Sequence, residues 1–207
     1  MTTEAYHFPD NFQSAMAFHG HVCPGLAIGY RAAVIALREL EADRPEDEEL
    51  VGVVENDACG VDALQCILGC TFGKGNLVFH DYGKQVFTVF SRVRGTAVRI
   101  ALKTDALPGD AERSRELFSK IREGTATPAE IAEHEESRRQ RIRALLERPA
   151  AELFDIRHIA GDPPARARIH QSLRCEECGE NVMETRARTS DGRVLCIPCV
   201  ESSAAKP

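Results

Sequence analysis

The sequence QVFTVFSRV at residues 85–93 and the sequence TAVRIAL at residues 96–102 flank the dipeptide Arg94-Gly95. Both flanking segments alternate in character with a period of two, which is the pattern of a β-strand. An intervening glycine is typical of a tight turn. This stretch therefore predicts two consecutive strands joined by a turn.

Further elements are expected on both sides of these strands. Short apolar runs at residues 50–54, 77–80 and 153–159 predict additional strands. Helical periodicity is found at residues 11–18, 26–40, 61–70, 110–123 and 128–147. This mixture of elements predicts an α+β core domain over residues 1–162, and Pro163-Pro164 marks the linker to a small C-terminal domain over residues 163–207.

Composition narrows the class of protein. The 207 residues include 26 basic and 32 acidic side chains, which gives a net charge of −6 and makes nucleic acid an unexpected partner. The apolar runs are too short to cross a bilayer. The first six residues lack the basic and apolar regions of a secretion signal. We therefore expect a cytoplasmic protein without membrane contact.

Eight cysteines are the most informative part of the composition. In a reducing compartment such residues are more often metal ligands or reactive thiols than disulfides. Four of them form two CxxC pairs with 17 residues between the pairs, at Cys175, Cys178, Cys196 and Cys199. Four thiolates complete a tetrahedral zinc shell, so a structural zinc ion is expected here. The segment is similar to small zinc-ribbon or treble-clef modules, and metal binding would supply its folding energy.

The other cysteines lie in the core domain, near two histidines. His19, His21 and Cys23 alternate in a loop that ends at a predicted helix start, so an extended loop would point all three to one side. The helix N-terminus would favour the thiolate form of Cys23. Cys59 precedes another helix start.

If the two helix starts abut, the four side chains converge on a transition-metal site. The spacing does not decide whether Cys23 or Cys59 is the third ligand. The alternative is that Cys66 and Cys70 are small core residues and His21 is an ordinary loop residue. Lys74 is interpreted as a turn residue or as an electrostatic partner of the cysteines.

Three motifs, in this order, resemble the signature of the FmdE family: HGHVCPGL at residues 19–26, CGVDALQ at residues 59–65 and GCTFGKGNL at residues 69–77. The family is named for a protein encoded with molybdenum or tungsten formylmethanofuran dehydrogenase. The resemblance implies a mixed β-sheet flanked by helices, a thioredoxin-like core and a homodimer. The C-terminal cysteines match a treble-clef zinc finger that some members carry.

The resemblance also implies a His/Cys active site that can hold zinc in some members. The positions that match the family's motif are His19, His21, Cys23, Cys59, Asp62, Gln65, Cys70 and Lys74. The resemblance does not supply a reaction.

Three functions from different classes are compatible with these patterns. The first is an accessory protein of a molybdenum or tungsten redox enzyme, which holds a second transition metal or a cofactor in the core and docks on the enzyme's subunits. The second is a stand-alone metal- or thiol-dependent enzyme. Its catalytic residues would be Cys59, Cys23, Asp62 and Lys74, and its core metal ligands would be His19, His21 and Cys59. In this enzyme Asp62 or Glu55 would be the general base or the hydrogen-bond partner of a histidine. The third is a metal- or redox-responsive regulator.

Overall fold

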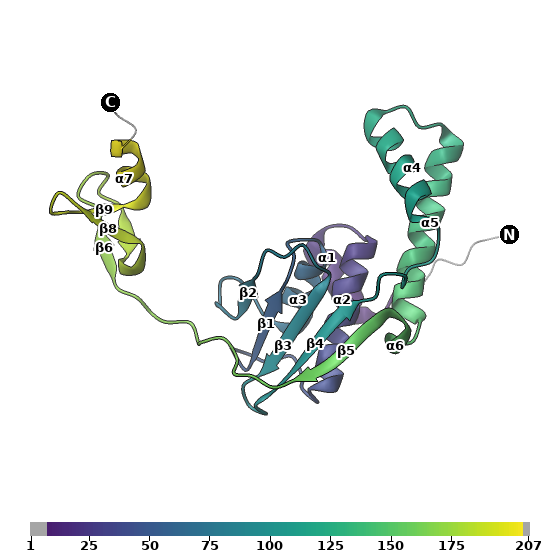
Figure 1. Cartoon of the computed structure of the whole chain (residues 1–207), viewed down its shortest axis with the longest axis horizontal. Coiled ribbons are helices and arrows are strands. Elements are labelled where there is room, and N and C mark those ends of the chain that lie inside the picture. The colour runs from purple at the N-terminus through teal and green to yellow at the C-terminus, as the bar shows by residue number, and fades with distance from the viewer. Residues whose placement is uncertain (1–7, 205–207) are drawn as a thin grey trace. The chain divides into compact units, whose positions relative to one another are not determined.

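The computed structural model describes residues 8–204 (Figure 1). The chain divides into two compact units, and the boundary between them falls between Arg166 and Ala167. The first unit contains a five-stranded sheet with helices. The second is a small unit that contains all four C-terminal cysteines.

The sheet of the first unit has the strand order β2-β1-β3-β4-β5. Its strands are β1 (Leu50–Val54), β2 (Leu77–Phe79), β3 (Val86–Ser91), β4 (Thr96–Leu102) and β5 (Phe154–Ile159). β1 pairs with β2 in parallel, and the other pairs are antiparallel. The predicted strand pair over residues 85–102 is thus β3 and β4, and the expected mixed sheet flanked by helices is confirmed.

Three helices pack together around the candidate site: α1 (Asp10–His19), α2 (Pro24–Glu39) and α3 (Gly60–Leu68). The helices α2 and α3 approach most closely at two glycines. A Cβ atom placed on Gly29 would lie 2.0 Å from the carbonyl oxygen of Gly60, so only glycine fits there. This contact brings the N-terminal ends of α2 and α3 together.

The end of α3 differs from the prediction. A helix was expected over residues 61–70, but it ends at Leu68 because Gly69 adopts a left-handed conformation with φ of 66°. Cys70 therefore lies beyond the helix, although the predicted helix over residues 61–70 included it.

Two further helices form an antiparallel hairpin, α4 (Ala111–Glu123) and α5 (Pro128–Glu147), which extends beyond the sheet (Figure 1). Asp110 caps α4, and Thr127 forms a capping box with Glu130 at the start of α5. The C-terminal part of α5 buries Ile142 and Leu145 in the main core. The short helix α6 (Ala150–Leu153) then leads into β5.

The second unit consists of short elements. These are β6 (Ser172–Arg174), β7 (Asn181–Met183), the 3₁₀ helix η1 (Glu184–Arg186), β8 (Ala187–Ser190), β9 (Arg193–Cys196) and α7 (Ile197–Ala204). A turn at residues 190–192 joins β8 to β9, with positive φ at Asp191 and Gly192. β7 pairs with β6.

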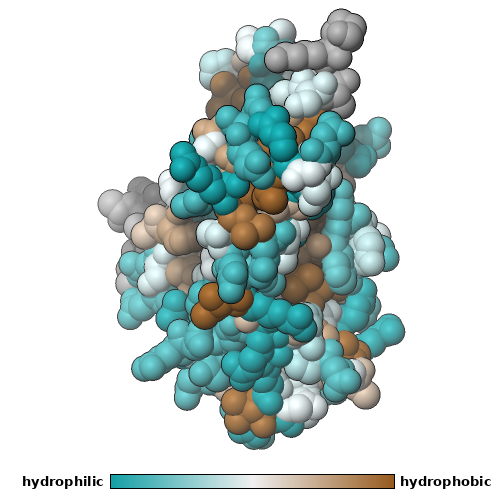
Figure 2. Space-filling view, turned by 90° about the vertical axis from the view of Figure 1, so that its left-hand side faces the viewer, coloured by the Kyte–Doolittle hydropathy of each residue, from teal (hydrophilic) through white to brown (hydrophobic). Residues whose placement is uncertain are grey.

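Surface composition fits a chain with this much charge. On the face that Figure 2 shows, hydrophilic side chains dominate and hydrophobic ones form separate patches. The large apolar side chains that reach the surface include Phe72 at 85% exposure and Phe79 at 49%. Both lie near the candidate site described next.

Candidate metal centre

Four side chains converge where α1, α2 and α3 meet. His19 ends α1, Cys23 is the N-cap of α2, Cys59 is the N-cap of α3, and His21 lies in the connecting loop. One ligand atom from each lies within 4.8 Å of the others. The starts of α2 and α3 thus lie side by side, which is the condition on which the sequence-based hypothesis of a metal site depends.

The local backbone explains this convergence. Gly20 has φ of 89° and turns the chain out of α1, and Cys23 is extended with φ of −148° and ψ of 163°. The rings of His19 and His21 consequently lie side by side, tilted by 39° with 4.4 Å between their centroids. Gly25 allows Cys59 to approach α2 closely, since a Cβ atom at Gly25 would lie only 3.2 Å from Cβ of Cys59.

His19 is oriented by a carboxylate. Its Nδ1 lies 2.6 Å from Oδ2 of Asp62, and Oδ1 of Asp62 accepts a hydrogen bond from Nε2 of Gln65 at 3.3 Å. This arrangement favours a proton on Nδ1 and a lone pair on Nε2, as in carboxylate–histidine–metal triads. The Nε2 atom of His19 is buried and has no hydrogen-bond partner among the described residues. Such an orphaned polar atom costs about 1–3 kcal/mol, and a metal ion would satisfy it.

The thiol of Cys59 is not poised as a free nucleophile. Burial raises the pKa of Cys59 above its ordinary value, and the neighbouring thiol of Cys23 raises it further. In the metal-free protein Cys59 is therefore a neutral thiol at neutral pH, and a bound cation would have to displace its proton. Cys23 accepts a hydrogen bond from the backbone N–H of Leu26 at 3.3 Å, so its sulfur does lie at the N-terminus of α2.

The donor set fits a borderline divalent metal. Two imidazoles and two thiols form the Cys₂His₂ combination that binds Zn²⁺ tetrahedrally. His21 is exposed, whereas the other three are partly buried. The loop that carries His21 is held from the helical hairpin, because the guanidinium of Arg138 donates a hydrogen bond to the carbonyl oxygen of Val22.

A groove of about 460 Å³ opens beside this cluster. His19 and Cys59 lie at one end of it, Asp62 and Gln65 line it from α3, and Phe72 belongs to its apolar part. The sequence did not single out the aromatic residues of the groove, because they come from a turn and from an edge strand that are separate in the chain.

Three other candidate residues lie outside the cluster. The ammonium group of Lys74 donates a hydrogen bond to the backbone carbonyl of Asp47 at 3.0 Å, and Lys74 is not among the residues that line the groove. Cys70 is fully buried beneath Gly52, and burial raises its pKa to about 11. Cys66 packs against the core, and burial raises its pKa as well. A catalytic role of Lys74 stays a prediction.

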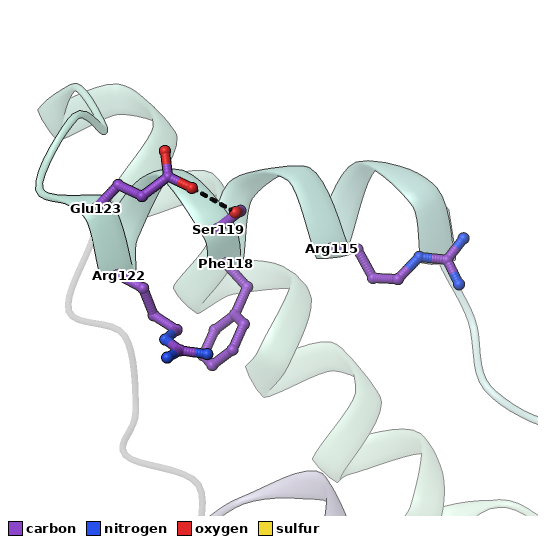
Figure 3. Close-up of a pocket in the computed structure, with 5 residues that line it drawn as sticks. All are labelled: Arg115, Phe118, Ser119, Arg122 and Glu123. Carbon is purple, nitrogen blue, oxygen red and sulfur yellow. Dashed lines mark hydrogen bonds between the residues drawn. The ribbon is translucent and has the colours of Figure 1, made fainter.

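A second hollow, of about 490 Å³, lies on α4 (Figure 3). Its lining residues are Arg115, Phe118, Ser119, Arg122 and Glu123. The guanidinium of Arg122 lies 6.0 Å from the centre of the Phe118 ring, and Ser119 donates a hydrogen bond to Glu123. The lining contains neither a cysteine nor a histidine among the described residues, so this hollow lacks the donors of the core cluster.

The C-terminal cysteines form the other cluster. The ligand atoms of Cys175, Cys178, Cys196 and Cys199 lie within 4.8 Å of one another. Backbone N–H groups of Cys178 and Cys196 lower the pKa of Cys175 to about 6, which favours the thiolate that zinc needs. Two of these cysteines and Leu195 are the buried residues of the unit's hydrophobic cluster. A core this small requires the metal for stability.

Two family models match the chain. The model described as "FmdE, Molybdenum formylmethanofuran dehydrogenase operon" matches residues 18–155. The model described as "Prokaryotic dksA/traR C4-type zinc finger" matches residues 170–203. The four cysteines of the second unit thus form a C4-type zinc-binding module.

The chain is similar to a curated protein and to solved structures. A "Probable S-adenosyl-L-methionine-binding protein" of Archaeoglobus fulgidus is 34% identical over 197 residues, which cover 91% of this chain. The match covers 52% of that relative, so the chain spans about half the relative's length. A tungsten formylmethanofuran dehydrogenase FmdE-like protein from Syntrophus aciditrophicus has a TM-score of 0.61 at 22% identity, and the match covers 96% of this chain and 95% of that one. This structural likeness supports the fold. Among residues 8–204, the helices are too short or too polar to cross a membrane.

Proposed function

Because the chain belongs to the FmdE family, we propose that it is a metal-binding protein whose core holds a transition metal at His19, His21, Cys23 and Cys59. The C-terminal zinc ion is structural, since four thiolates leave no open position. The core metal would be the functional one.

The observation that carries this proposal is the state of His19. Its Nδ1 is committed to Asp62 at 2.6 Å, while its Nε2 is buried and lacks a partner within the described structure. One ring nitrogen of His19 lies within 4.8 Å of ligand atoms from His21, Cys23 and Cys59. A histidine that served only packing would pair both nitrogens or expose one to water. Asp62 and Gln65 add the outer hydrogen bonds that orient metal-ligating histidines.

The exposure of His21 suggests how such a site would work. Cys23, Cys59 and His19 are partly buried and would retain a metal, whereas His21 can leave without disturbing the core. Its departure would open one position for a substrate or for transfer of the metal to another protein. When bound, the metal would supply Lewis acidity or be the cargo itself.

We further propose that the protein is an accessory of a molybdenum or tungsten redox enzyme and acts as a homodimer. The support for the accessory role is the description of the family, which refers to a formylmethanofuran dehydrogenase operon, and the homodimer is what the family resemblance implies. We do not propose that this chain binds S-adenosylmethionine, which the name of the archaeal relative mentions, because the chain matches only about half of that protein.

A metal-dependent enzyme is the second candidate. The groove beside the cluster favours it, because His19, Cys59 and Asp62 all line that space. In this role Asp62, which is 38% exposed, would accept or donate a proton at its free oxygen while it holds His19 in place.

Elemental analysis of the purified full chain tests the core metal site. The proposal predicts two metal ions per chain, one of which is lost in the double variant His21→Ala/Cys59→Ser. The matched control His80→Ala/Cys66→Ser removes one histidine and one cysteine outside the cluster and should retain both ions. One ion per chain, lost only in Cys175→Ser/Cys178→Ser, would refute the proposal.

A further inference from the structure

The groove beside the core cluster carries exposed aromatic side chains. Phe72 follows α3 and is 85% exposed, and Phe79 ends β2 and is 49% exposed; both line the groove. Val54, Val61 and Leu77 line it as well. Exposed apolar side chains that gather around a concave space mark a binding site for an apolar ligand.

The charges in this groove have one sign. Its charged lining residues are Asp57 and Asp62, and the described lining contains no lysine or arginine. The nearby carboxylate of Glu55 lies 3.5 Å from Arg99, and neither side chain lines the groove. A divalent metal bound by two thiolates would add no net charge, so metal binding would not reverse the sign. Anionic ligands are therefore repelled.

The polar groups also show which end of a ligand would face inward. Gln65 is already engaged, since its Nε2 donates to Asp62 and its Oε1 accepts from the backbone N–H of Phe72. The exposed carboxylate of Asp57 and the outer part of Asp62 are acceptors for a donor group on the ligand. The volume of about 460 Å³ suits a molecule with one or two rings.

We propose that this groove binds a small aromatic ligand that is neutral or positively charged, with its ring against Phe72 and Phe79 and its hydrogen-bond donors toward Asp57 and Asp62. The inference rests on the proposed function in one respect, because it names the ligand class that would reach His19 and Cys59. It excludes phosphorylated and carboxylated small molecules as ligands of the groove.

Three probes that share one ring separate the effect of charge from the effect of size. Benzamidine is cationic, benzamide is neutral and benzoate is anionic. Each is titrated into the ¹⁵N-labelled full chain, and the amide signals of Ala58, Val61 and Phe72 report binding in the groove. We expect benzamidine to bind at least about ten times more tightly than benzoate, with benzamide between them, and we expect the shifts to centre on these amides.

Variants locate the site. Phe72→Ala and Phe79→Ala should each weaken benzamidine binding about fivefold, and Asp57→Asn should reduce its advantage over benzamide. Phe118→Ala is the matched control, because Phe118 is 52% exposed on the separate hollow of α4, where arginines line the surface. It should leave benzamidine binding unchanged. The amide spectrum of each variant shows directly whether the chain has folded.

Two results would overturn the inference. One is benzoate binding as tightly as benzamidine at the groove amides, and the other is benzamidine binding that is absent or insensitive to Phe72→Ala and Phe79→Ala. The metal content of the same samples is measured separately. If the chain lacks a core metal but still binds benzamidine selectively, the proposed metal function is refuted and the proposed ligand site is supported. If the chain holds a core metal but shows no such selectivity, the ligand site is refuted and the metal function is supported.

Discussion

Replacing Asp62 should weaken metal binding in the core without removing a ligand. In the wild-type chain Nδ1 of His19 lies 2.6 Å from the carboxylate, and the His19 side chain is only 11% exposed. In Asp62→Asn the amide oxygen can still accept this hydrogen bond, but a charged bond worth about 1.5–3 kcal/mol becomes a neutral one worth about 0.5–1.5 kcal/mol. The difference of about 1–1.5 kcal/mol corresponds to a loss of about tenfold in metal affinity.

Asp62→Ala should have a larger effect, because it leaves Nδ1 without its partner and releases the ring from its orientation. Loss of such an outer-shell partner lowers metal affinity by about 10–100-fold. The affinity is measured by titrating Zn²⁺ against a chromogenic chelator in the Cys175→Ser/Cys178→Ser background, which lacks two of the C-terminal ligands.

Asp57→Asn is the matched control for this series. Asp57 lines the same groove, but the ligand cluster does not include it. Its replacement tests whether a general loss of negative charge explains the effect. Equal losses in Asp57→Asn and Asp62→Asn, or unchanged affinity in Asp62→Ala, would refute the reasoning that Asp62 acts through His19.

Three other predictions concern the scaffold. Gly29→Ala places a Cβ atom 2.0 Å from the carbonyl oxygen of Gly60. It should lower the free energy of unfolding by about 1–3 kcal/mol in a denaturant titration and reduce the core metal content. Unchanged stability would contradict this packing. The hydrogen bond from Lys120 is the main cause that lowers the pKa of Glu130 from 4.5 to about 2. The ionised Glu130 should therefore stabilise the helix fully above pH 4.5, and this stabilisation should disappear as the pH falls toward 2. Circular dichroism should show the loss, and Glu130→Gln should abolish this part of the pH dependence. A strong chelator should unfold the C-terminal unit, because its hydrophobic cluster is small. The amide signals of this unit should then lose their dispersion, while the signals of β3 and β4 stay dispersed. Dispersed signals from residues 172–196 after complete zinc removal would contradict a metal-dependent fold.

Local patterns predicted much of the fold. The period-two alternation around Arg94-Gly95 correctly gave β3 and β4, and Pro24 correctly marked the start of α2. The predicted end of α3 was wrong. The helical periodicity of the sequence continues past Gly69, but the left-handed conformation of this glycine ends the helix at Leu68. Cys70 was therefore predicted in a helix, whereas in the structure it lies beyond the helix and is buried beneath Gly52 of β1.

The candidate site was predictable to the extent that its residues occupy helix starts. His19, His21 and Cys23 were expected to alternate along one extended loop, but His19 ends α1 and Gly20 turns the chain with φ of 89°. Only Cys23 is extended, so the convergence of the three residues depends on this turn, which the alternation did not predict. The enzyme hypothesis included Asp62 or Glu55 as a general base or as the partner of a histidine. Spacing could not show that Asp62 pairs with His19, because the two are 43 residues apart in the chain. The aromatic groove was also missed, since Phe72 and Phe79 come together only when β2 pairs with β1.

The most direct test of the core metal site is zinc X-ray absorption on the Cys175→Ser/Cys178→Ser variant after reconstitution with one equivalent of Zn²⁺. The donor set in the core predicts two nitrogen ligands at about 2.0–2.1 Å and two sulfur ligands at about 2.3 Å. His21→Ala in the same background should lose one of the nitrogen ligands. Zinc that is not retained by this variant, or a spectrum without sulfur ligands that is unchanged by His21→Ala, would contradict the proposed metal centre.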